Sequence, residues 1–137
     1  MKRKILSKLI EWKNKKNRKP LIVNGARQVG KTYILKEFGS HYYEKMAYVN
    51  CDKNKTLDKI FSQDYNISRI LLSLSAILHV NIEPENTLII FDEIQENPTV
   101  LNSLKYFCED ASQYHVAVAG SLLGISLHRD TSFPVGK

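Results

Sequence analysis

Residues 25–32, Gly-Ala-Arg-Gln-Val-Gly-Lys-Thr, match the pattern G-x-x-x-x-G-K-[ST] at every constrained position. Gly25 and Gly30 have no Cβ, so this segment can bend sharply and turn consecutive backbone N–H groups toward phosphate oxygens. Lys31 is placed to contact the β- and γ-phosphates, and the Thr32 hydroxyl is suited to bind the accompanying Mg²⁺. The pattern predicts a nucleoside triphosphate site, whose cofactor-binding residues we assign as Gly25, Ala26, Arg27, Gln28, Val29, Gly30, Lys31, Thr32 and Tyr33.

The flanking segments have the order that such a loop requires. Leu-Ile-Val at 21–23 is a short β-favouring run that leads into the loop, and residues 33–38 continue as a helix that ends near Gly39. The helix would begin at Lys31 and add its N-terminal dipole to the phosphate site. A glycine turn before an ordinary helix is the competing interpretation, and the strand, loop and helix order argues against it.

A second motif lies at residues 87–93, Thr-Leu-Ile-Ile-Phe-Asp-Glu. Its apolar run predicts a strand that is buried on both faces, as in a parallel sheet covered by helices. Asp92 at its carboxyl end fits the Walker B role of holding Mg²⁺ through the water shell of the ion. Glu93 could polarise a water for attack on the γ-phosphate. We therefore assign Thr32 and Asp92 to the metal, and Lys31 and Glu93 to catalysis.

A third strand is predicted over residues 115–121, which end in Gly120 and Ser121. A polar side chain at the tip of the strand between the two motif strands can touch the γ-phosphate or the attacking water. Ser121 is our candidate for this catalytic sensor. Gly-Ser after a strand is also ordinary turn chemistry, and the sequence leaves both interpretations open.

Together these segments resemble the prokaryotic AAA-like ATPases, a family that typically carries a C-terminal domain of unknown function. The resemblance rests on the loop at 25–32, Phe-Asp-Glu-Ile-Gln at 91–95, Ser-Leu-Lys-Tyr-Phe at 103–107, Ala-Gly-Ser at 119–121 and Ser-Phe-Pro-Val-Gly-Lys at 132–137. It implies a three-layer α/β P-loop NTPase core of the AAA type with a parallel sheet, and Mg-ATP as ligand. It also implies the roles given above for Lys31, Thr32, Asp92 and Glu93.

The same resemblance sets an expectation for the sheet. Cores of this type usually order their strands 5-1-4-3-2, and the sequence predicts four strands, at 21–25, 46–52, 87–92 and 115–121. Helices are predicted near 54–62, 67–79 and from Pro98 to about Asp110. We expect the core to be truncated before its fifth strand. The phosphate-loop strand would then be an open edge, which predicts self-association.

The basic charge of the chain is concentrated at its N-terminus. The net charge is +6, and residues 1–19 hold nine Lys or Arg against Glu11 alone. Residues 3–13 predict an amphipathic helix, followed by a charged connector and then a core at 20–137. Residues 1–19 could contact nucleic-acid phosphates or anionic lipid, although a lysine-rich run is more often only a solvated face.

Composition limits the cellular context. The length of 137 residues with 43% hydrophobic residues fits one domain. Cys51 and Cys108 have no metal-ligand spacing and are expected to be free thiols of a reducing compartment. No apolar run reaches the length of a membrane span, and no signal peptide is apparent, which predicts a cytoplasmic protein with no membrane span.

Three other functions remain open to different degrees. GTP is disfavoured because Asn54-Lys55 is not followed by an aspartate at the guanine-reading position. A small-molecule kinase does not generally need an acid that activates water, so Asp92-Glu93 argues against one. A nucleotide-operated binding switch with little turnover cannot be separated from an ATPase by sequence.

No arginine finger is assured, although Arg27 and Arg129 lie near the motifs.

Overall fold

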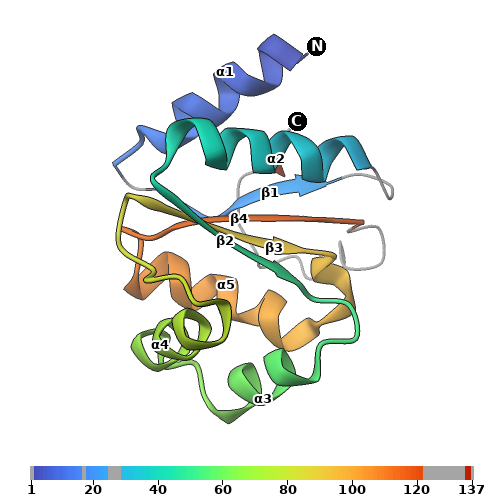
Figure 1. Ribbon diagram of the computed structural model, residues 1–137, viewed down its shortest axis with the longest axis vertical. Helices are drawn as coiled ribbons and strands as arrows, with labels where there is room; N and C mark the ends of the chain where they lie inside the picture. The colour runs from blue at the N-terminus through green and yellow to red at the C-terminus, as the bar shows by residue number, and fades with distance from the viewer. Residues whose placement is uncertain (1, 17, 25–28, 122–134, 137) are drawn as a thin grey trace.

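The computed structural model describes residues 2–16, 18–24, 29–121 and 135–136. These ranges contain both helices and strands (Figure 1). In order, the elements are α1 (Lys2–Lys13), β1 (Leu21–Asn24), α2 (Val29–Tyr42), β2 (Lys45–Asn50), α3 (Lys55–Gln63), α4 (Ile67–Leu78), β3 (Thr87–Asp92), the 3-10 turn η1 (Ile94–Glu96), α5 (Pro98–Asp110), β4 (His115–Gly120) and β5 (Val135–Gly136).

The described strands form one parallel sheet in the order β2-β3-β4-β1-β5. Read from the other edge, this is the predicted order 5-1-4-3-2, which is confirmed. β4 lies between β1 and β3, so the glycine-loop strand and the strand with the two acids are next-but-one neighbours. All strands run in the same direction, and their carboxyl ends therefore meet at one edge of the sheet.

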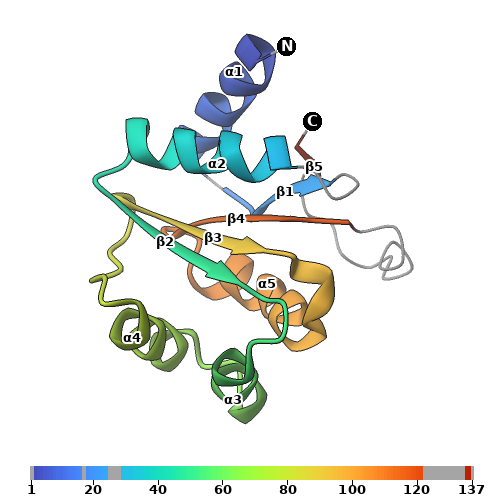
Figure 2. The same ribbon diagram turned by 45° about the vertical axis from the view of Figure 1, so that its right-hand side comes forward.

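The prediction that the fifth strand is absent was wrong. β5 pairs with β1, with Val135 opposite Ile22 and Gly136 opposite Val23 (Figure 2). This strand covers the β1 edge at those two positions, which removes the argument for self-association through an open edge. This strand could not be predicted from the sequence, because two residues beside Pro134 carry neither an apolar run nor an alternating pattern.

Helices cover both faces of the sheet and make three layers. α1 and α2 lie on one face, and α3, α4 and α5 lie on the other (Figure 1). β3 shows how one strand serves both layers, since successive side chains point to opposite faces. Leu88 and Ile90 belong to the buried cluster on the side of α1 and α2, whereas Ile89 and Phe91 belong to the cluster on the side of α3–α5. Every residue of β3 is buried, as its apolar run predicts.

Each helix of the second layer begins at an asparagine. The side-chain oxygens of Asn54, Asn66 and Asn97 accept hydrogen bonds from backbone N–H groups three residues later, at 3.0, 3.1 and 3.2 Å. This bond satisfies an N–H that has no partner within the helix. Pro98 follows the last of these caps at a position where a missing N–H costs nothing. The predicted starts of α3, α4 and α5 were right to within a residue.

The boundaries of α2 and β2 differ from the predicted ones. α2 starts at Val29 and runs through Gly39 to Tyr42, although we expected a helix from Lys31 that ends near Gly39. Gly39 is buried inside the helix, where an added Cβ would lie 2.6 Å from the sulfur of Met46. This glycine thus permits close packing of α2 on β2 and does not cap the helix. β2 ends at Asn50, two residues before the expected end.

The predicted N-terminal helix forms and turns its apolar side to the sheet. Leu9 and Trp12 of α1 are buried in the same cluster as Leu21 of β1 and Leu35 of α2. In the described part of the chain, no helix combines the length and the apolar character needed to cross a membrane.

Candidate active site

Thr32 and Asp92 meet at the carboxyl edge of the sheet, as the two motifs predict. Thr32 lies in the first turns of α2, which follows β1, and Asp92 is the last residue of β3. The Thr32 hydroxyl donates a hydrogen bond of 3.1 Å to Asp92 Oδ2. This contact joins a residue beside the glycine loop to the second motif, sixty positions further along the chain.

The alternation of β3 determines the side on which Asp92 lies. Asp92 has the same parity as Leu88 and Ile90, whose side chains face α2. Its carboxylate therefore points to the layer that contains Thr32. Only 6% of the Asp92 surface is exposed, so the carboxylate needs hydrogen-bond donors from the protein or from a ligand.

Tyr48 provides a second donor to the same carboxylate oxygen. It lies on β2 opposite Ile90, on the face covered by α2, and its hydroxyl donates a 2.5 Å hydrogen bond to Asp92 Oδ2. Burial, followed by the hydrogen bond to Asp92, raises the pKa of Tyr48 far above its usual value. Tyr48 consequently stays protonated and remains a donor at neutral pH.

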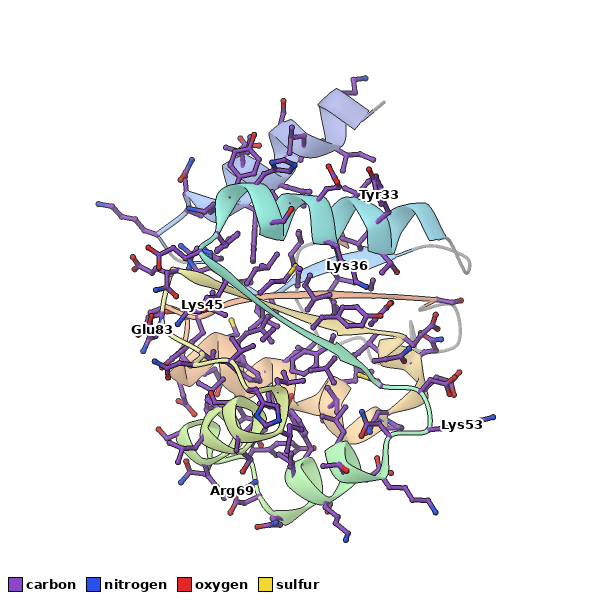
Figure 3. The ribbon with its side chains drawn as sticks, in the orientation of Figure 1. Tyr33, Lys36, Lys45, Lys53, Arg69 and Glu83 are labelled. Carbon is purple, nitrogen blue, oxygen red and sulfur yellow. The ribbon has the colours of Figure 1, made fainter. Side chains whose placement is uncertain are left out.

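The ring of Tyr48 also contacts a lysine of α2. Lys36 Nζ lies 4.0 Å from the ring centroid, within the range of a cation–π contact. Figure 3 shows Lys36 extending from α2 toward β2. Lys36 and Thr32 are one helical turn apart, so the same side of α2 contacts both the ring of Tyr48 and the carboxylate of Asp92.

The second oxygen of Asp92 is held by the backbone that follows it. The Glu93 N–H donates a 2.9 Å hydrogen bond to Asp92 Oδ1. Three donors from β2, α2 and the chain after β3 thus fix one carboxylate. Hydrogen bonds to an ionised acceptor are among the stronger ones in proteins, so this arrangement orients Asp92 firmly.

Glu93 lies next to this carboxylate in an unusual backbone conformation. Its φ of 54° and ψ of 47° place it in the left-handed region, which residues other than glycine rarely adopt. The chain turns there from β3 into η1. The Glu93 Oε1 atom accepts a hydrogen bond of 2.7 Å from Gln95 Nε2. The structure thus places the predicted base directly beyond the strand end, at the edge where Thr32 lies.

Ser121 follows the last residue of β4, the strand between β1 and β3. Its backbone N–H donates a 3.1 Å hydrogen bond to Gln95 Oε1. Ser121 is therefore joined to Glu93 through one amide side chain. Its position agrees with the place expected for a sensor, and the role of its hydroxyl stays a prediction.

Most of the glycine loop lies outside the described residues. The structure does not describe four residues of the loop, Gly25, Ala26, Arg27 and Gln28. It also does not describe the side chains of Val29 and Lys31, or Arg129 further along the chain. Gly30 is exposed in the first turn of α2, and an added Cβ there would have open space around it. Tyr33 is 50% exposed on the same helix (Figure 3).

The basic N-terminal segment is divided between packing and the surface. Arg18 is buried, and its guanidinium donates hydrogen bonds to the backbone oxygens of Lys13, Lys15 and Ser112 at 2.9–3.0 Å. These bonds tie the connector to the turn before β4. The side chains of Lys15 and Lys16 are exposed. Arg18 therefore has a structural role. The prediction that this segment contacts nucleic acid now depends on exposed lysines such as Lys15 and Lys16.

Two side chains of this site, Tyr48 and Gln95, had no role predicted from the sequence. The position of Tyr48 does carry a signal. It lies two residues before the end of β2, and the alternation of side chains along a strand points it toward α2. Gln95 was part of the motif at 91–95 but had no assigned role. Its contact depends on the left-handed turn at Glu93, which the residue types do not predict.

The side chains of this site also bear on metal binding. Among the described residues, no group of three or more His, Cys, Asp or Glu is placed to hold a metal ion by itself. Mg²⁺ that accompanies a nucleotide usually needs only one or two protein oxygens, because phosphates and waters supply the others. The Thr32 hydroxyl and the Asp92 carboxylate are a donor set of this kind.

The family model described as an AAA domain matches residues 17–137 of this chain. A search among curated proteins found no match.

Proposed function

This chain belongs to the AAA domain family, and we propose that its site binds Mg-ATP and hydrolyses it. Membership of the family indicates a P-loop ATPase-like domain. The motifs at 25–32 and 91–95 support the more specific proposal that the site binds and hydrolyses Mg-ATP.

The single observation that carries the proposal is the hydrogen bond between Thr32 Oγ1 and Asp92 Oδ2. Thr32 comes directly after the loop that would bind phosphates, and Asp92 is the buried acid at the end of β3. Hydroxyl and carboxylate oxygens are the ligands that Mg²⁺ prefers. A magnesium ion held by these two groups would explain why a buried carboxylate faces the first turns of α2.

The remaining residues fit the binding of phosphates. The N–H groups of the loop and of the start of α2 would point at phosphate oxygens, and the dipole of this helix favours an anion at its N-terminus. Lys31 would neutralise charge on the β- and γ-phosphates. Asp92 and Thr32 would hold Mg²⁺, which neutralises charge on the transferred phosphoryl group when it is bound.

Glu93 would act in the hydrolytic step. The oxygen of a water molecule forms a bond to the γ-phosphorus while the bond from that phosphorus to the bridging oxygen of ADP breaks. The Glu93 carboxylate accepts the proton that the water loses, and the products are ADP and inorganic phosphate. Ser121 is our candidate for the group that touches the γ-phosphate from the end of β4.

The test combines nucleotide titration with measurement of phosphate release. Lys31→Ala should weaken ATP binding sharply, whereas Lys59→Ala, which removes an exposed lysine of α3 on the other face of the sheet, should bind as wild type does. Asp92→Ala should remove the Mg²⁺ dependence of binding. Glu93→Gln should bind Mg-ATP and release phosphate about a hundred-fold more slowly or worse.

Two results would contradict this function. Equal affinity of wild type and Lys31→Ala would mean that the loop does not bind phosphate. Tight binding of Mg-ATP by the wild type with no phosphate release would exclude hydrolysis and support the nucleotide-operated switch.

A further inference from the structure

The amide of Gln95 joins Glu93 to the end of β4. Its nitrogen donates to Glu93 Oε1 at 2.7 Å, and its oxygen accepts from the Ser121 N–H at 3.1 Å. One side chain thus acts as donor to an acid and as acceptor from a backbone amide. The Gln amide carries a donor and an acceptor on one planar group, and the two partners fix which way the amide faces.

The backbone around Gln95 is built for this contact. Glu93 has left-handed dihedral angles, and the turn after it is closed by the bonds from Glu96 N to Glu93 O at 3.0 Å and from Asn97 N to Ile94 O at 3.1 Å. The side chain of Ile94, between Glu93 and Gln95 in the sequence, is fully buried and anchors the turn. Gln95 therefore projects from a fixed point beside the end of β4.

Gly120 permits the close approach of this amide. Its φ is +154°, and an added Cβ would lie 2.2 Å from Gln95 Oε1 and 3.0 Å from Ile94 N. A side chain at position 120 would occupy the place that the Gln95 amide takes. The absence of a side chain at position 120 therefore lets the Gln95 amide reach the end of β4.

Among the described residues, the Glu93 carboxylate accepts fewer hydrogen bonds than the Asp92 carboxylate does. Within the described residues, Gln95 is the only side chain that donates a hydrogen bond to the Glu93 carboxylate, whereas Asp92 accepts from Thr32, Tyr48 and the Glu93 N–H. The orientation of Glu93 is therefore sensitive to a change at position 95.

We propose that Gln95 is a positioning residue that orients the Glu93 carboxylate for hydrolysis and makes this orientation depend on the position of the Ser121 backbone. The inference rests on the proposed function, since it concerns the step assigned to Glu93. A base that is misplaced by about 1 Å can lose a hundred-fold in rate while binding is unchanged. Loss of the Gln95 contact should accordingly lower kcat and leave the affinity for Mg-ATP intact.

The first variant is Gln95→Glu, which keeps the size of the side chain but replaces the donor with a carboxylate that repels Glu93. Its kcat should fall about ten-fold or more while the KM for ATP stays within about three-fold of wild type. Gln95→Met is the second variant, because it removes both hydrogen bonds without adding a charge. Gln113→Glu makes the same change in the exposed turn before β4, at the opposite end of that strand, and should leave both parameters unchanged.

A double-mutant cycle separates positioning from a merely structural role. In single-turnover measurements of ATP hydrolysis, Gln95→Met should slow wild type about ten-fold but slow the Glu93→Gln protein by less than about two-fold, because the group that it orients is already gone. An equal ten-fold loss in both backgrounds would overturn the inference. So would a wild-type kcat in both Gln95 variants while Glu93→Gln is slow, and the proposed function would then stand. If Glu93→Gln itself hydrolyses ATP at the wild-type rate, the proposed base fails and this inference fails with it.

Discussion

The hydroxyl of Tyr48, on the edge strand β2, donates a 2.5 Å hydrogen bond to Asp92 at the end of the neighbouring strand β3. The two residues lie on the same face of the sheet, and the Thr32 hydroxyl contacts the same carboxylate oxygen. Asp92 is thereby oriented by side chains of two elements, α2 and β2. A side chain outside both sequence motifs is thus part of the proposed Mg²⁺ site.

Tyr48→Phe should lower the stability of the protein. The variant keeps the ring and its contact with Lys36 but removes one donor from a buried carboxylate, which should reduce the free energy of unfolding by about 1–2 kcal/mol. Urea denaturation measures this change. Tyr42→Phe, which removes the hydroxyl of a tyrosine that is 41% exposed, is the control and should stay within about 0.5 kcal/mol of wild type. Equal unfolding midpoints for Tyr48→Phe and wild type would show that the hydroxyl does not stabilise Asp92.

The two cysteines should react at very different rates in the native protein. Cys51 is fully buried, and burial, followed by the charges of Asp92 and Glu93, raises the pKa of its thiol to about 12. Cys108 on α5 is partly exposed. Because the thiolate is the reactive form, a chromogenic disulfide reagent at pH 8 should modify Cys108 first and Cys51 only on addition of denaturant. Rapid modification of the native Cys108→Ser variant would contradict the buried position of Cys51.

Much of this fold follows from local patterns in the sequence. The apolar run at 87–92 predicts a strand buried on both faces, and the structure confirms it. Asparagine before an apolar helical pattern marks the starts of α3 and α4, because its side chain can accept from the first free N–H groups. Thr32 and Asp92 were assigned from the sequence to one Mg²⁺ ion, and the structure brings them within hydrogen-bond distance, although binding of the ion stays a prediction.

The features that were not predicted depend on contacts between distant segments. The left-handed backbone at Glu93 places Gln95 against the end of β4, and no residue type at 93–95 indicates it. Gly39 suggested a helix end by its type, although its actual role is to let Met46 approach α2. β5 is recognised only by its pairing with β1.

His115 should make stability depend on pH. Its ring is buried against Trp12 and Tyr43, and the Tyr43 hydroxyl lies 2.5 Å from Nδ1. Burial, followed by the charges of Arg18 and Lys13, lowers the pKa of His115 to about 3. The unfolded chain binds a proton near pH 6.5, whereas the native protein does not. The stability that neutral His115 contributes is therefore fully present above pH 6.5 and is lost as the pH falls toward 3.

The variant His115→Gln isolates this contribution. Free energies of unfolding measured from pH 7 to pH 4 should fall more steeply for wild type than for the variant, with a difference of up to about 1.4 kcal/mol per pH unit. His41→Gln removes an exposed histidine of α2 and should retain the wild-type slope. Parallel pH profiles for wild type and His115→Gln would show that His115 has the same pKa in the native and unfolded protein.

Mg-ATP should stabilise the wild-type protein against unfolding, because a ligand that binds only the native state shifts the equilibrium toward it. At a ligand concentration one hundred times the dissociation constant, the free energy of unfolding should rise by about 2.7 kcal/mol. Thermal melts with Mg-ATP, and with ATP plus a chelator of Mg²⁺, measure the effect and its dependence on the metal. Lys31→Ala should lose the stabilisation at the same ligand concentration, whereas Lys59→Ala should keep it. A melting temperature of the wild type that does not respond to Mg-ATP, in a protein that is folded without it, would mean that Thr32 and Asp92 meet for a purely structural reason.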